Sequence, residues 1–416
     1  MRRFSTSTLY YNYQTQFVPM KIPNTQTPVL ILNCKIGALA ILRSLGRLGI
    51  SIYGIDDDPA SPVMKSRYFT EKFYKVFDEN NQQEYLDFVL VTGQKLGRKS
   101  LLIPTSDELA VFVAENSEQL SRYFIFPGLD ADLAKDLISK KEMFTIATRH
   151  DVPTPTTLFP KKIEDVEEFA SRIQYPVMLK GIHGNRLFAR TGLKMAIAES
   201  KEELLAKYEE LEDPESPNLM LQEHIPGGDD QVYIFNGYFN ENSDCLSAFT
   251  GHKIRQAPIH FGCASLGICK WNAEVAEITI RLMKNIGYKG VLDIGYRLDP
   301  RGGRYKVLDI NPRVGGAFRI FVAKNGMDVV RSLYLDMTNQ QQLPIARREG
   351  RRWVYEDYDI ISTYCYFKEG SLGVGEWVKS FKGVQEGAWF SWKDPLPFLA
   401  TMTRLGKRAL KGVMKR

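Results

Sequence analysis

Two aspartates stand in apolar segments that a short turn separates. Asp293 lies in Val291-Leu-Asp-Ile294, and Asp309 lies in Tyr305-Lys-Val-Leu-Asp-Ile310. If these segments pair as strands, side-chain alternation places both carboxylates on one face, and Asn311 adds an amide oxygen to it. Two carboxylates on one face repel each other unless a cation lies between them, and Mg²⁺ prefers such oxygen ligands. The three residues therefore predict a magnesium site.

Basic residues near these segments have the chemistry of a phosphate site. Lys180 closes the apolar run Tyr175-Pro-Val-Met-Leu-Lys180 and precedes Gly181-Ile-His-Gly184, while Arg313 follows Asn311 at period two. Lysine and arginine donate to phosphate oxygens, and glycines let a loop close over them. Taken alone, a lysine at a strand end is more often solvated. The basic side chains therefore indicate a phosphate site only in combination with the carboxylates.

A further strand leaves the core at Leu221-Gln-Glu-His-Ile-Pro-Gly227. Glu223 there could accept a hydrogen bond from an adenine amino group, since adenine needs an apolar slot with a few polar partners at its edge. An exposed acid at a strand end is the alternative interpretation. The three groups of residues together indicate a nucleotide site.

Apolar runs and turn residues predict the elements that position these side chains. A strand at 28–33, a helical pattern up to Gly49 and a strand at 50–55 read as a βαβ unit. With another strand at 101–104, this indicates a Rossmann-like domain over about residues 28–130. A helix over 131–149 ends before two prolines, because proline disfavours helix at the residue before it. The remaining expected strands are 175–180, 219–223, 291–294 and 305–310, with a hairpin turn at 299–303.

Four segments, in order, resemble the ATP-grasp superfamily. Lys140 precedes Val152-Pro-Thr-Pro155, as the family's first ATP lysine precedes a similar stretch. Pro176-Val-Met-Leu-Lys180 resembles the strand with the second ATP lysine, Gln222-Glu-His-Ile-Pro-Gly227 the adenine hinge, and Asp309-Ile-Asn-Pro-Arg-Val-Gly-Gly316 the metal strand. Four weak motifs in the right order make a specific match. The resemblance implies an α/β protein: a Rossmann-like N-terminal domain, an ATP-grasp fold of two α+β subdomains, and a small C-terminal region.

The resemblance also implies a role for each matched residue. Lys140 and Lys180 would hold the α- and β-phosphates, with Lys141 as a one-residue ambiguity. Arg313 would steady the transferred phosphate or the acyl phosphate. Lys253 and Arg255 would meet phosphate or the substrate carboxylate, unless they lie on an exposed polar strand. The other implied contacts are adenine at Glu223, His224 and Ile225; ribose at Asp230, or at Asp229; and magnesium at Asp293, Asp309 and Asn311.

The chain departs from the family pattern in two places. Many relatives carry Glu where Asp309 stands, but a shorter carboxylate also binds magnesium. The family's phosphate loop is small and glycine-rich, whereas Asn185-Arg-Leu-Phe-Ala-Arg190 is bulky. Arg186 or Arg190 could add a phosphate contact there.

The implied function is ATP-dependent ligation of a small carboxylate to an amine through an acyl phosphate, with Mg²⁺ or Mn²⁺ as cofactor. Carboxylate–amine ligases such as D-aspartate ligase are the nearest group, which Arg43-Ser-Leu-Gly-Arg-Leu-Gly49 also favours. One alternative is a non-catalytic ATP-binding sensor or scaffold. Another is an NAD-dependent oxidoreductase, but Asn33-Cys-Lys-Ile-Gly37 offers one glycine where G-x-G-x-x-G is needed.

The charge of the 416-residue chain is concentrated at its end. Of 55 basic residues, six lie from Arg404 to Arg416, and removing them leaves 49 against 49 acidic residues. A neutral body argues against a nucleic-acid surface. The end has the pattern of a basic amphipathic helix, which either docks on its own domain or contacts anionic membrane. We expect a flexible segment at 1–27, an ATP-grasp domain at 131–345, a C-terminal region at 346–416, a cytoplasmic location and a homodimer.

Overall fold

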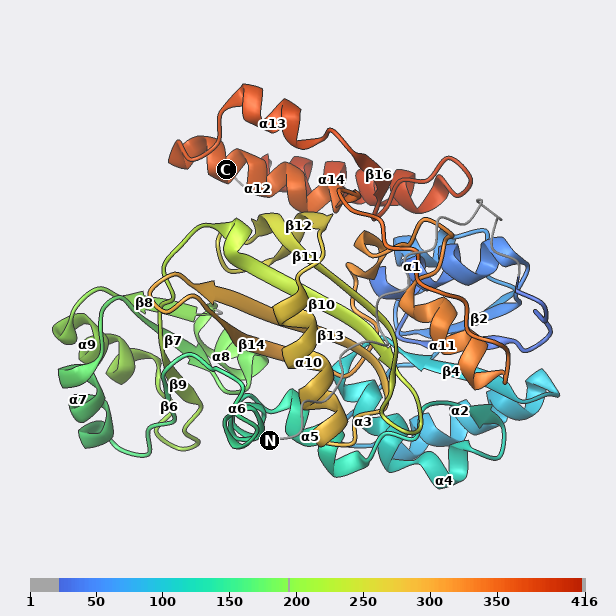
Figure 1. Ribbon diagram of the computed structural model, residues 1–416, viewed down its shortest axis with the longest axis horizontal. Helices are drawn as coiled ribbons and strands as arrows, with labels where there is room; N and C mark the ends of the chain where they lie inside the picture. The colour runs from blue at the N-terminus through green and yellow to red at the C-terminus, as the bar shows by residue number, and fades with distance from the viewer. Residues whose placement is uncertain (1–21, 194, 414–416) are drawn as a thin grey trace, which may run out of the picture.

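Three β-sheets organise the computed structural model, which describes residues 22–193 and 195–413 (Figure 1). Residues 1–21 of the predicted flexible segment lie outside this part. Ile22 is buried, the Asn24 amide donates to Gln340 at 2.8 Å, and the Thr27 carbonyl accepts from Tyr334. Residues 22–27 therefore pack on the fold, which corrects the expected boundary at residue 27. In the described part, no helix combines the length and the hydropathy that a membrane crossing requires.

The first sheet is parallel and has the order β3-β2-β1-β4-β5. Its core strands are runs of branched apolar residues that helices cover, as expected for a parallel sheet. The strands predicted at 28–33, 50–55 and 101–104 correspond to its β1, β2 and β4. The elements of this region are β1 (Val29–Leu32), α1 (Ile36–Leu45), β2 (Ile52–Asp56), β3 (Glu71–Tyr74), α2 (Gln82–Leu96), β4 (Ser100–Pro104), α3 (Asp107–Glu115), α4 (Ser117–Leu120) and β5 (Phe124–Ile125).

Two helices follow where a single helix over 131–149 was predicted. Helix α5 (Ala131–Ile138) ends at Ser139, whose hydroxyl then caps α6 (Lys140–Arg149) by accepting from the Glu142 amide. A serine that bonds the backbone in this way favours the start of a new helix. The break places Lys140 at the first turn of α6, where the helix dipole favours an anion.

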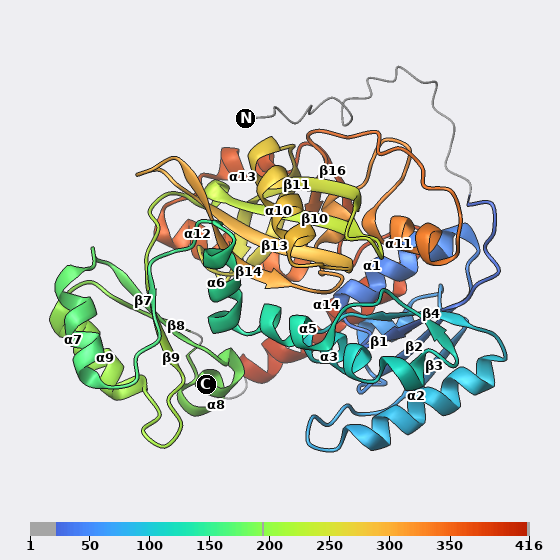
Figure 2. The same ribbon diagram turned by 60° about the horizontal axis from the view of Figure 1, so that its bottom comes forward.

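The second sheet has four strands in the order β6-β9-β7-β8 and stands apart with its own helices (Figure 2). Its apolar core lies between the sheet and α7 and α9. The elements are β6 (Thr157–Leu158), α7 (Ile163–Arg172), β7 (Val177–Gly181), α8 (Gly184–Thr191), β8 (Met195–Ala198), α9 (Lys201–Leu211) and β9 (Leu219–Glu223).

The third sheet has seven strands in the order β14-β13-β10-β11-β12-β15-β16. Its last two strands come from beyond residue 346, so the predicted boundary at 345 cuts through one sheet. Figure 1 shows β13 and β14 between the two other sheets. The elements are β10 (Val232–Phe239), β11 (Cys245–Ala257), β12 (Cys263–Cys269), α10 (Ala273–Asn285), β13 (Gly290–Asp299), β14 (Arg304–Asn311), α11 (Val329–Met337), β15 (Arg352–Val354), α12 (Glu356–Glu369), α13 (Val374–Ser380), β16 (Val384–Gly387) and α14 (Leu396–Val413).

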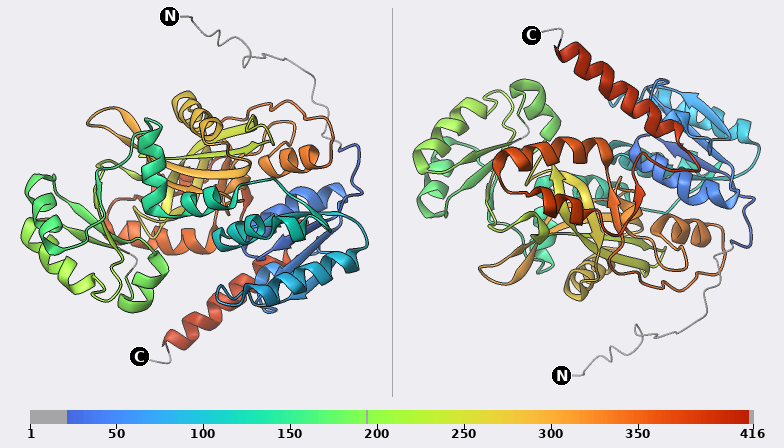
Figure 3. Two further views of the ribbon diagram at one scale, coloured as in Figure 1. Left: turned by 90° about the horizontal axis from the view of Figure 1, so that it is seen from below. Right: turned by 90° about the horizontal axis from the view of Figure 1, so that it is seen from above.

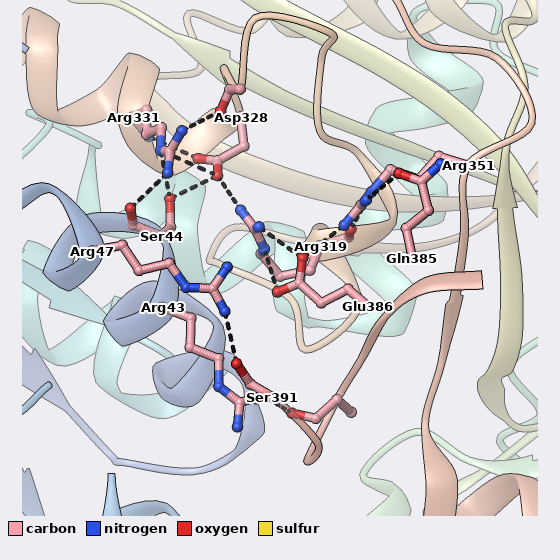
Figure 4. Close-up of polar contacts among 12 residues, drawn as sticks. Arg43, Ser44, Arg47, Arg319, Asp328, Arg331, Arg351, Gln385, Glu386 and Ser391 are labelled. Atoms are coloured by element: carbon pink, nitrogen blue, oxygen red, sulfur yellow. Dashed lines mark hydrogen bonds and ion pairs between the residues drawn. The ribbon is translucent and has the colours of Figure 1, made fainter. Parts of the chain in front are cut away.

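A buried polar network joins α1 to the third sheet (Figure 4). Asp328 accepts from Ser44 Oγ at 2.7 Å and from Arg319 at 2.6 Å. Arg319 also donates to Glu386 at 2.8 Å, and Glu386 accepts from Arg351 at 2.7 Å. Buried charges are tolerated when each has hydrogen-bonded partners. The network fixes the first sheet on the third.

The neighbouring Arg43 has a structural role as well. Its guanidinium is buried and donates to the carbonyl of Ala388 and to the carboxylate of Asp394. Asp394 also accepts from Ser66 Oγ at 2.8 Å and from the Arg67 amide at 3.0 Å. The motif at 43–49 thus anchors the segment that leads into α14.

Candidate active site

The carboxylate pair lies on two antiparallel strands whose register brings it together. Asp293 on β13 is directly opposite Asn311 on β14, and Gly295 is opposite Asp309. Asn311 Nδ2 donates to Asp309 Oδ2 at 2.8 Å and to the Asp293 carbonyl at 3.1 Å. The predicted single face is therefore confirmed for Asp293, Asp309 and Asn311.

Two glycines make room for these carboxylates. A Cβ at Gly295 would lie 2.3 Å from Asp309 Oδ1, and a Cβ at Gly315 would lie 1.8 Å from Asp293 Oδ2. Such distances are far below van der Waals contact, so only glycine leaves both carboxylates where they stand. The strand pair and the turn after it thus form a cradle for two buried acids.

The two acids differ in their electrostatic surroundings. Burial raises the pKa of Asp293 to about 6, and the charge of Asp309 acts in the same direction. Burial acts on Asp309 too, but Lys140 and Lys253 outweigh it and lower the pKa of Asp309 below its ordinary value. A cation between the two would remove their repulsion.

The oxygens of this cradle fit magnesium better than zinc. No group of three or more His, Cys, Asp or Glu side chains in the described ranges is placed to hold a metal. Two carboxylates and an amide are nevertheless suitable for Mg²⁺, which keeps several waters and takes further oxygens from substrate phosphates. Asp293, Asp309 and Asn311 would hold it.

Three lysines converge on the cradle from different elements. The charge of Lys140 lowers the pKa of both Lys180 and Asp309, as expected for a lysine near them. Lys141 is exposed, so its neighbour Lys140 is the better candidate of the two. Lys180 Nζ donates to Gln222 at 2.8 Å, and burial together with Lys140 lowers the pKa of Lys180 to about 8. Lys253 donates to the Gly262 carbonyl at 2.7 Å.

Arg313 has a partner that the sequence did not reveal. Its Nε donates to Asp107 at 2.7 Å, and its Nη2 donates to Asn311 at 3.2 Å. Asp107 begins α3 and follows β4, so it comes from the first sheet. The Thr105-Ser-Asp107 turn at a strand end was a visible signal, but nothing in the sequence links it to a residue 206 positions away.

Arg255 does not join the predicted group, because β11 contains a bulge. Lys253 is opposite Gly267 and Arg255 is opposite Leu266, so Ile254 is the extra residue. An extra residue turns the following side chain to the other face of the sheet. Arg255 is buried there, and its guanidinium donates to both oxygens of Asp359 at 2.8 and 2.7 Å. The role predicted for Arg255 is therefore corrected to a structural one.

Ion pairs of Glu223 fix the segment at the end of β9, which was predicted as the adenine hinge. Glu223 is 6% exposed and accepts from the Thr156 amide at 2.8 Å, from Arg301 at 2.7 Å and from Lys306. Burial alone would raise the pKa of Glu223, but Lys306, the Thr156 amide and Arg301 hold it below its ordinary value. Glu223 thus ties the hinge to the β13–β14 hairpin.

The two residues after Glu223, His224 and Ile225, were predicted to contact adenine. The His224 amide donates to the Pro176 carbonyl at 3.2 Å, so it does not face a ligand. The Ile225 side chain is buried, 2% exposed. The adenine contact expected at His224 and Ile225 stays a prediction.

The two candidate ribose acids have different environments. Asp229 accepts from Gln256 at 2.9 Å, from His260 at 3.1 Å and from Tyr366, so its carboxylate is engaged within the protein. Asp230 is exposed. The structure thus favours Asp230 over Asp229 as a ligand group.

The predicted phosphate loop is largely the helix α8. Its two arginines bind to the 211–216 segment: Arg186 donates to the Ser216 carbonyl at 3.0 Å and to the Asp213 carboxylate at 3.4 Å, and Arg190 donates to the Leu211 carbonyl. The suggested phosphate contacts of Arg186 and Arg190 are therefore absent from this arrangement. Bulky residues between Gly184 and Gly192 favour helix over an open loop, which accounts for the difference.

No protein-family model matches the chain. D-aspartate ligase from Enterococcus faecium is 28% identical over 246 residues, which cover 56% of this chain and 58% of that protein. The mitochondrial arginine-specific carbamoyl phosphate synthase large chain from Neurospora crassa is 26% identical over 310 residues, covering 70% and 24%. The chain thus spans less than two thirds of the length of these curated relatives.

Solved structures share the fold. L-amino acid ligase from Bacillus licheniformis has a TM-score of 0.58 at 14% identity and covers 79% of each chain. N5-carboxyaminoimidazole synthetase from Staphylococcus aureus has a TM-score of 0.59 at 13% identity, covering 81% of this chain and 83% of that one. The resemblance to ATP-grasp ligases is confirmed by homology to D-aspartate ligase and by this fold.

Proposed function

We propose that the chain is an ATP-dependent ligase that joins a carboxylate to an amine through an acyl phosphate and releases ADP and phosphate. The observation that supports it most is the β13–β14 pair, where Asp293, Asp309 and Asn311 share one face. The relatives named as a D-aspartate ligase and an L-amino acid ligase favour the same class.

In this proposal the nucleotide binds between the second and third sheets and contacts residues of both. Lys140 and Lys180 bind the α- and β-phosphates, and the backbone at 224–225 meets adenine, while Asp230 binds the ribose hydroxyls. Glu223 acts on adenine through the hinge that it holds, since both of its oxygens already accept hydrogen bonds.

The chemical step in this proposal requires a negatively charged carboxylate to attack the negatively charged γ-phosphate. Mg²⁺, or Mn²⁺, held by Asp293, Asp309 and Asn311 would supply a Lewis acid that screens the γ-phosphate. Lys253 and Arg313 neutralise further negative charge while the carboxylate oxygen attacks phosphorus in line. The bond from phosphorus to ADP breaks as the new oxygen–phosphorus bond forms. The amine then attacks the acyl carbon, its nitrogen loses a proton to water, and phosphate leaves with both bonding electrons.

We also propose a domain division that follows the sheets. Residues 28–130 form a Rossmann-like unit, and the ATP-grasp unit begins at residue 131 and includes β15 and β16. Arg313 and Asp107 connect the two units at the site. Both substrates are small molecules in this proposal, and a homodimer stays a prediction.

ADP release tests the function. The protein is incubated with Mg-ATP and pairs of amino acids and amines, and ADP is measured with each component omitted in turn. The proposal expects ADP only when a carboxylate and an amine are both present. ATP binding without ADP from any pair would favour the sensor instead.

A further inference from the structure

The middle of helix α12 buries polar side chains and exposes apolar ones, while Lys368 and Glu369 at its end are exposed. The buried side chains are Asp359, Ser362, Thr363 and Tyr366, of which Asp359 pairs with Arg255. The opposite face exposes apolar side chains: Ile360 at 61%, Ile361 at 55%, Tyr364 at 68% and Phe367 at 37%. A helix on a water-exposed surface normally has the reverse arrangement. The outer face of α12 therefore has the composition of a contact surface.

The exposed apolar surface extends beyond α12. Ten of the sixteen exposed large hydrophobic side chains in the described part lie between residues 358 and 399. Trp392 is 87% exposed, and Val374 and Val378 on α13 are 68% and 59% exposed. Figure 3, right, shows α12, α13 and α14 on one side of the molecule. We call this surface, from Tyr358 to Leu399, the C-terminal face.

Basic side chains lie around this face and outnumber its exposed acids, Glu369 and Glu376. The exposed basic residues of the region are Lys368, Lys379, Lys382, Lys393, Arg404 and Lys407. By contrast, Asp359 pairs with Arg255, Glu386 with Arg319, and Asp394 with Arg43. The face therefore presents apolar and basic groups together, although the region also contains carboxylates.

We propose that the C-terminal face binds peripherally to an anionic lipid bilayer. Exposed tryptophan and tyrosine suit the level of the headgroups, isoleucine and valine enter the acyl boundary, and lysines attract anionic lipid. Two copies placed face to face would instead bring like charges together. Helix α14 projects from the body (Figure 3, left), so it extends the basic part of the face. This inference does not depend on the ligase chemistry.

Vesicle co-sedimentation of the full chain tests the proposal. Vesicles of phosphatidylcholine with phosphatidylglycerol are compared with phosphatidylcholine alone. We expect the protein to sediment only with the anionic vesicles, and high salt to weaken the binding. A triple variant with Ile361→Ser, Tyr364→Ser and Trp392→Ser should partition at least about tenfold less, because these exposed groups insert into the bilayer.

A matched triple variant controls for the loss of exposed apolar groups in general. Tyr74→Ser, Val76→Ser and Val91→Ser change exposed side chains of the first sheet region, and this variant should bind vesicles like the wild type. Recovery of the wild type in the supernatant with both vesicles, or equal binding of the two triple variants, would overturn the proposal. A dimer that dissociates in the first triple variant without vesicle binding would also overturn it. ADP release without vesicles stays unchanged in both variants, so failure of the ligase proposal is recognised separately.

Discussion

The β13–β14 cradle and helix α8 flank the same site but differ in how their polar groups are used. In the cradle, two buried acids face each other across a strand pair, and glycines at 295 and 315 keep space for them. In α8, Arg186 and Arg190 donate to carbonyls of the 211–216 segment. The cradle thus gathers two buried carboxylates and several cations in one place. The arginines of α8 instead bind to the 211–216 segment of the second sheet region.

This difference indicates that the cradle carries the chemical step and that α8 does not. Strand register fixes which residues of the cradle face each other, and the glycines at 295 and 315 leave their carboxylates space. Helix α8 packs on the second sheet through Leu187 and bonds to the 211–216 segment through its arginines, so it belongs to a different sheet from the cradle. Variants in the cradle should therefore change turnover strongly, and variants in α8 only weakly.

The largest effect is expected from Asp309→Ala. Loss of one of two metal carboxylates removes the charge that balances magnesium, and ADP release should fall by about 1000-fold or more. Circular dichroism should match the wild type, since the side-chain hydrogen bond of Asp309 within the described residues is local, to Asn311 two residues away. Turnover close to the wild-type rate would refute the cradle as the metal site.

The next effect is expected from Gly315→Ala. The new Cβ would meet Asp293 Oδ2 at 1.8 Å, so the carboxylate must move by an ångström or more, and kcat should fall about 100-fold. Gly302→Ala is the matched control, since no heavy atom lies within 4 Å of its added Cβ. Equal kcat values for the two variants would show that the position of Asp293 is unimportant.

The pKa of Lys180 predicts a pH dependence. This pKa is lowered to about 8, so Lys180 is charged below pH 8 and loses its charge as pH rises through that value. The kcat/KM for ATP should therefore fall about tenfold per pH unit above pH 8. Lys180→Arg stays charged and should remove this fall. An unchanged profile in that variant would assign the titration to another group.

A smaller effect is expected from Asp107→Asn. The pair with Arg313 is partly exposed, with side-chain exposures of 35% and 20%, so its loss is worth about 1 kcal/mol or less. The kcat should fall about fivefold, while the KM for ATP is unchanged because Asp107 contacts Arg313, whose proposed role is on the transferred phosphate during the chemical step. A change confined to the KM for ATP would contradict its positioning of Arg313.

The smallest effect is expected in α8. Arg186→Ala and Arg190→Ala should change the KM for ATP by less than about twofold, since both side chains bond to the 211–216 segment. Initial rates at varied ATP measure this. A tenfold rise in KM would mean that the arginines turn toward phosphate during turnover, which would abolish the contrast with the cradle.

Local patterns were enough to predict most of the cradle. Alternation along two strands and a five-residue turn placed Asp293, Asp309 and Asn311 together, because a hairpin fixes register over a short distance. The strand at 219–223 was also predicted with the bounds that the structure has. These elements depend on neighbours close in sequence.

Features that depend on distant contacts or single-residue irregularities were not predictable. The bulge at Ile254 sends Arg255 to α12, and no residue type in Lys253-Ile-Arg255 marks it. Asp107 reaches Arg313 only because the first sheet packs on the third. Ser139 splits the predicted helix through a cap whose strength depends on the tertiary position of α6.

Oxygen transfer tests the central claim most directly. The protein is given Mg-ATP, an amine and a carboxylate substrate labelled with ¹⁸O in the carboxyl group, and the released phosphate is analysed by mass spectrometry. An acyl phosphate forms through a carboxylate oxygen and breaks at the acyl carbon, so each phosphate should carry one ¹⁸O atom. Unlabelled phosphate, released together with the amide product, would contradict carboxylate activation at the β13–β14 cradle.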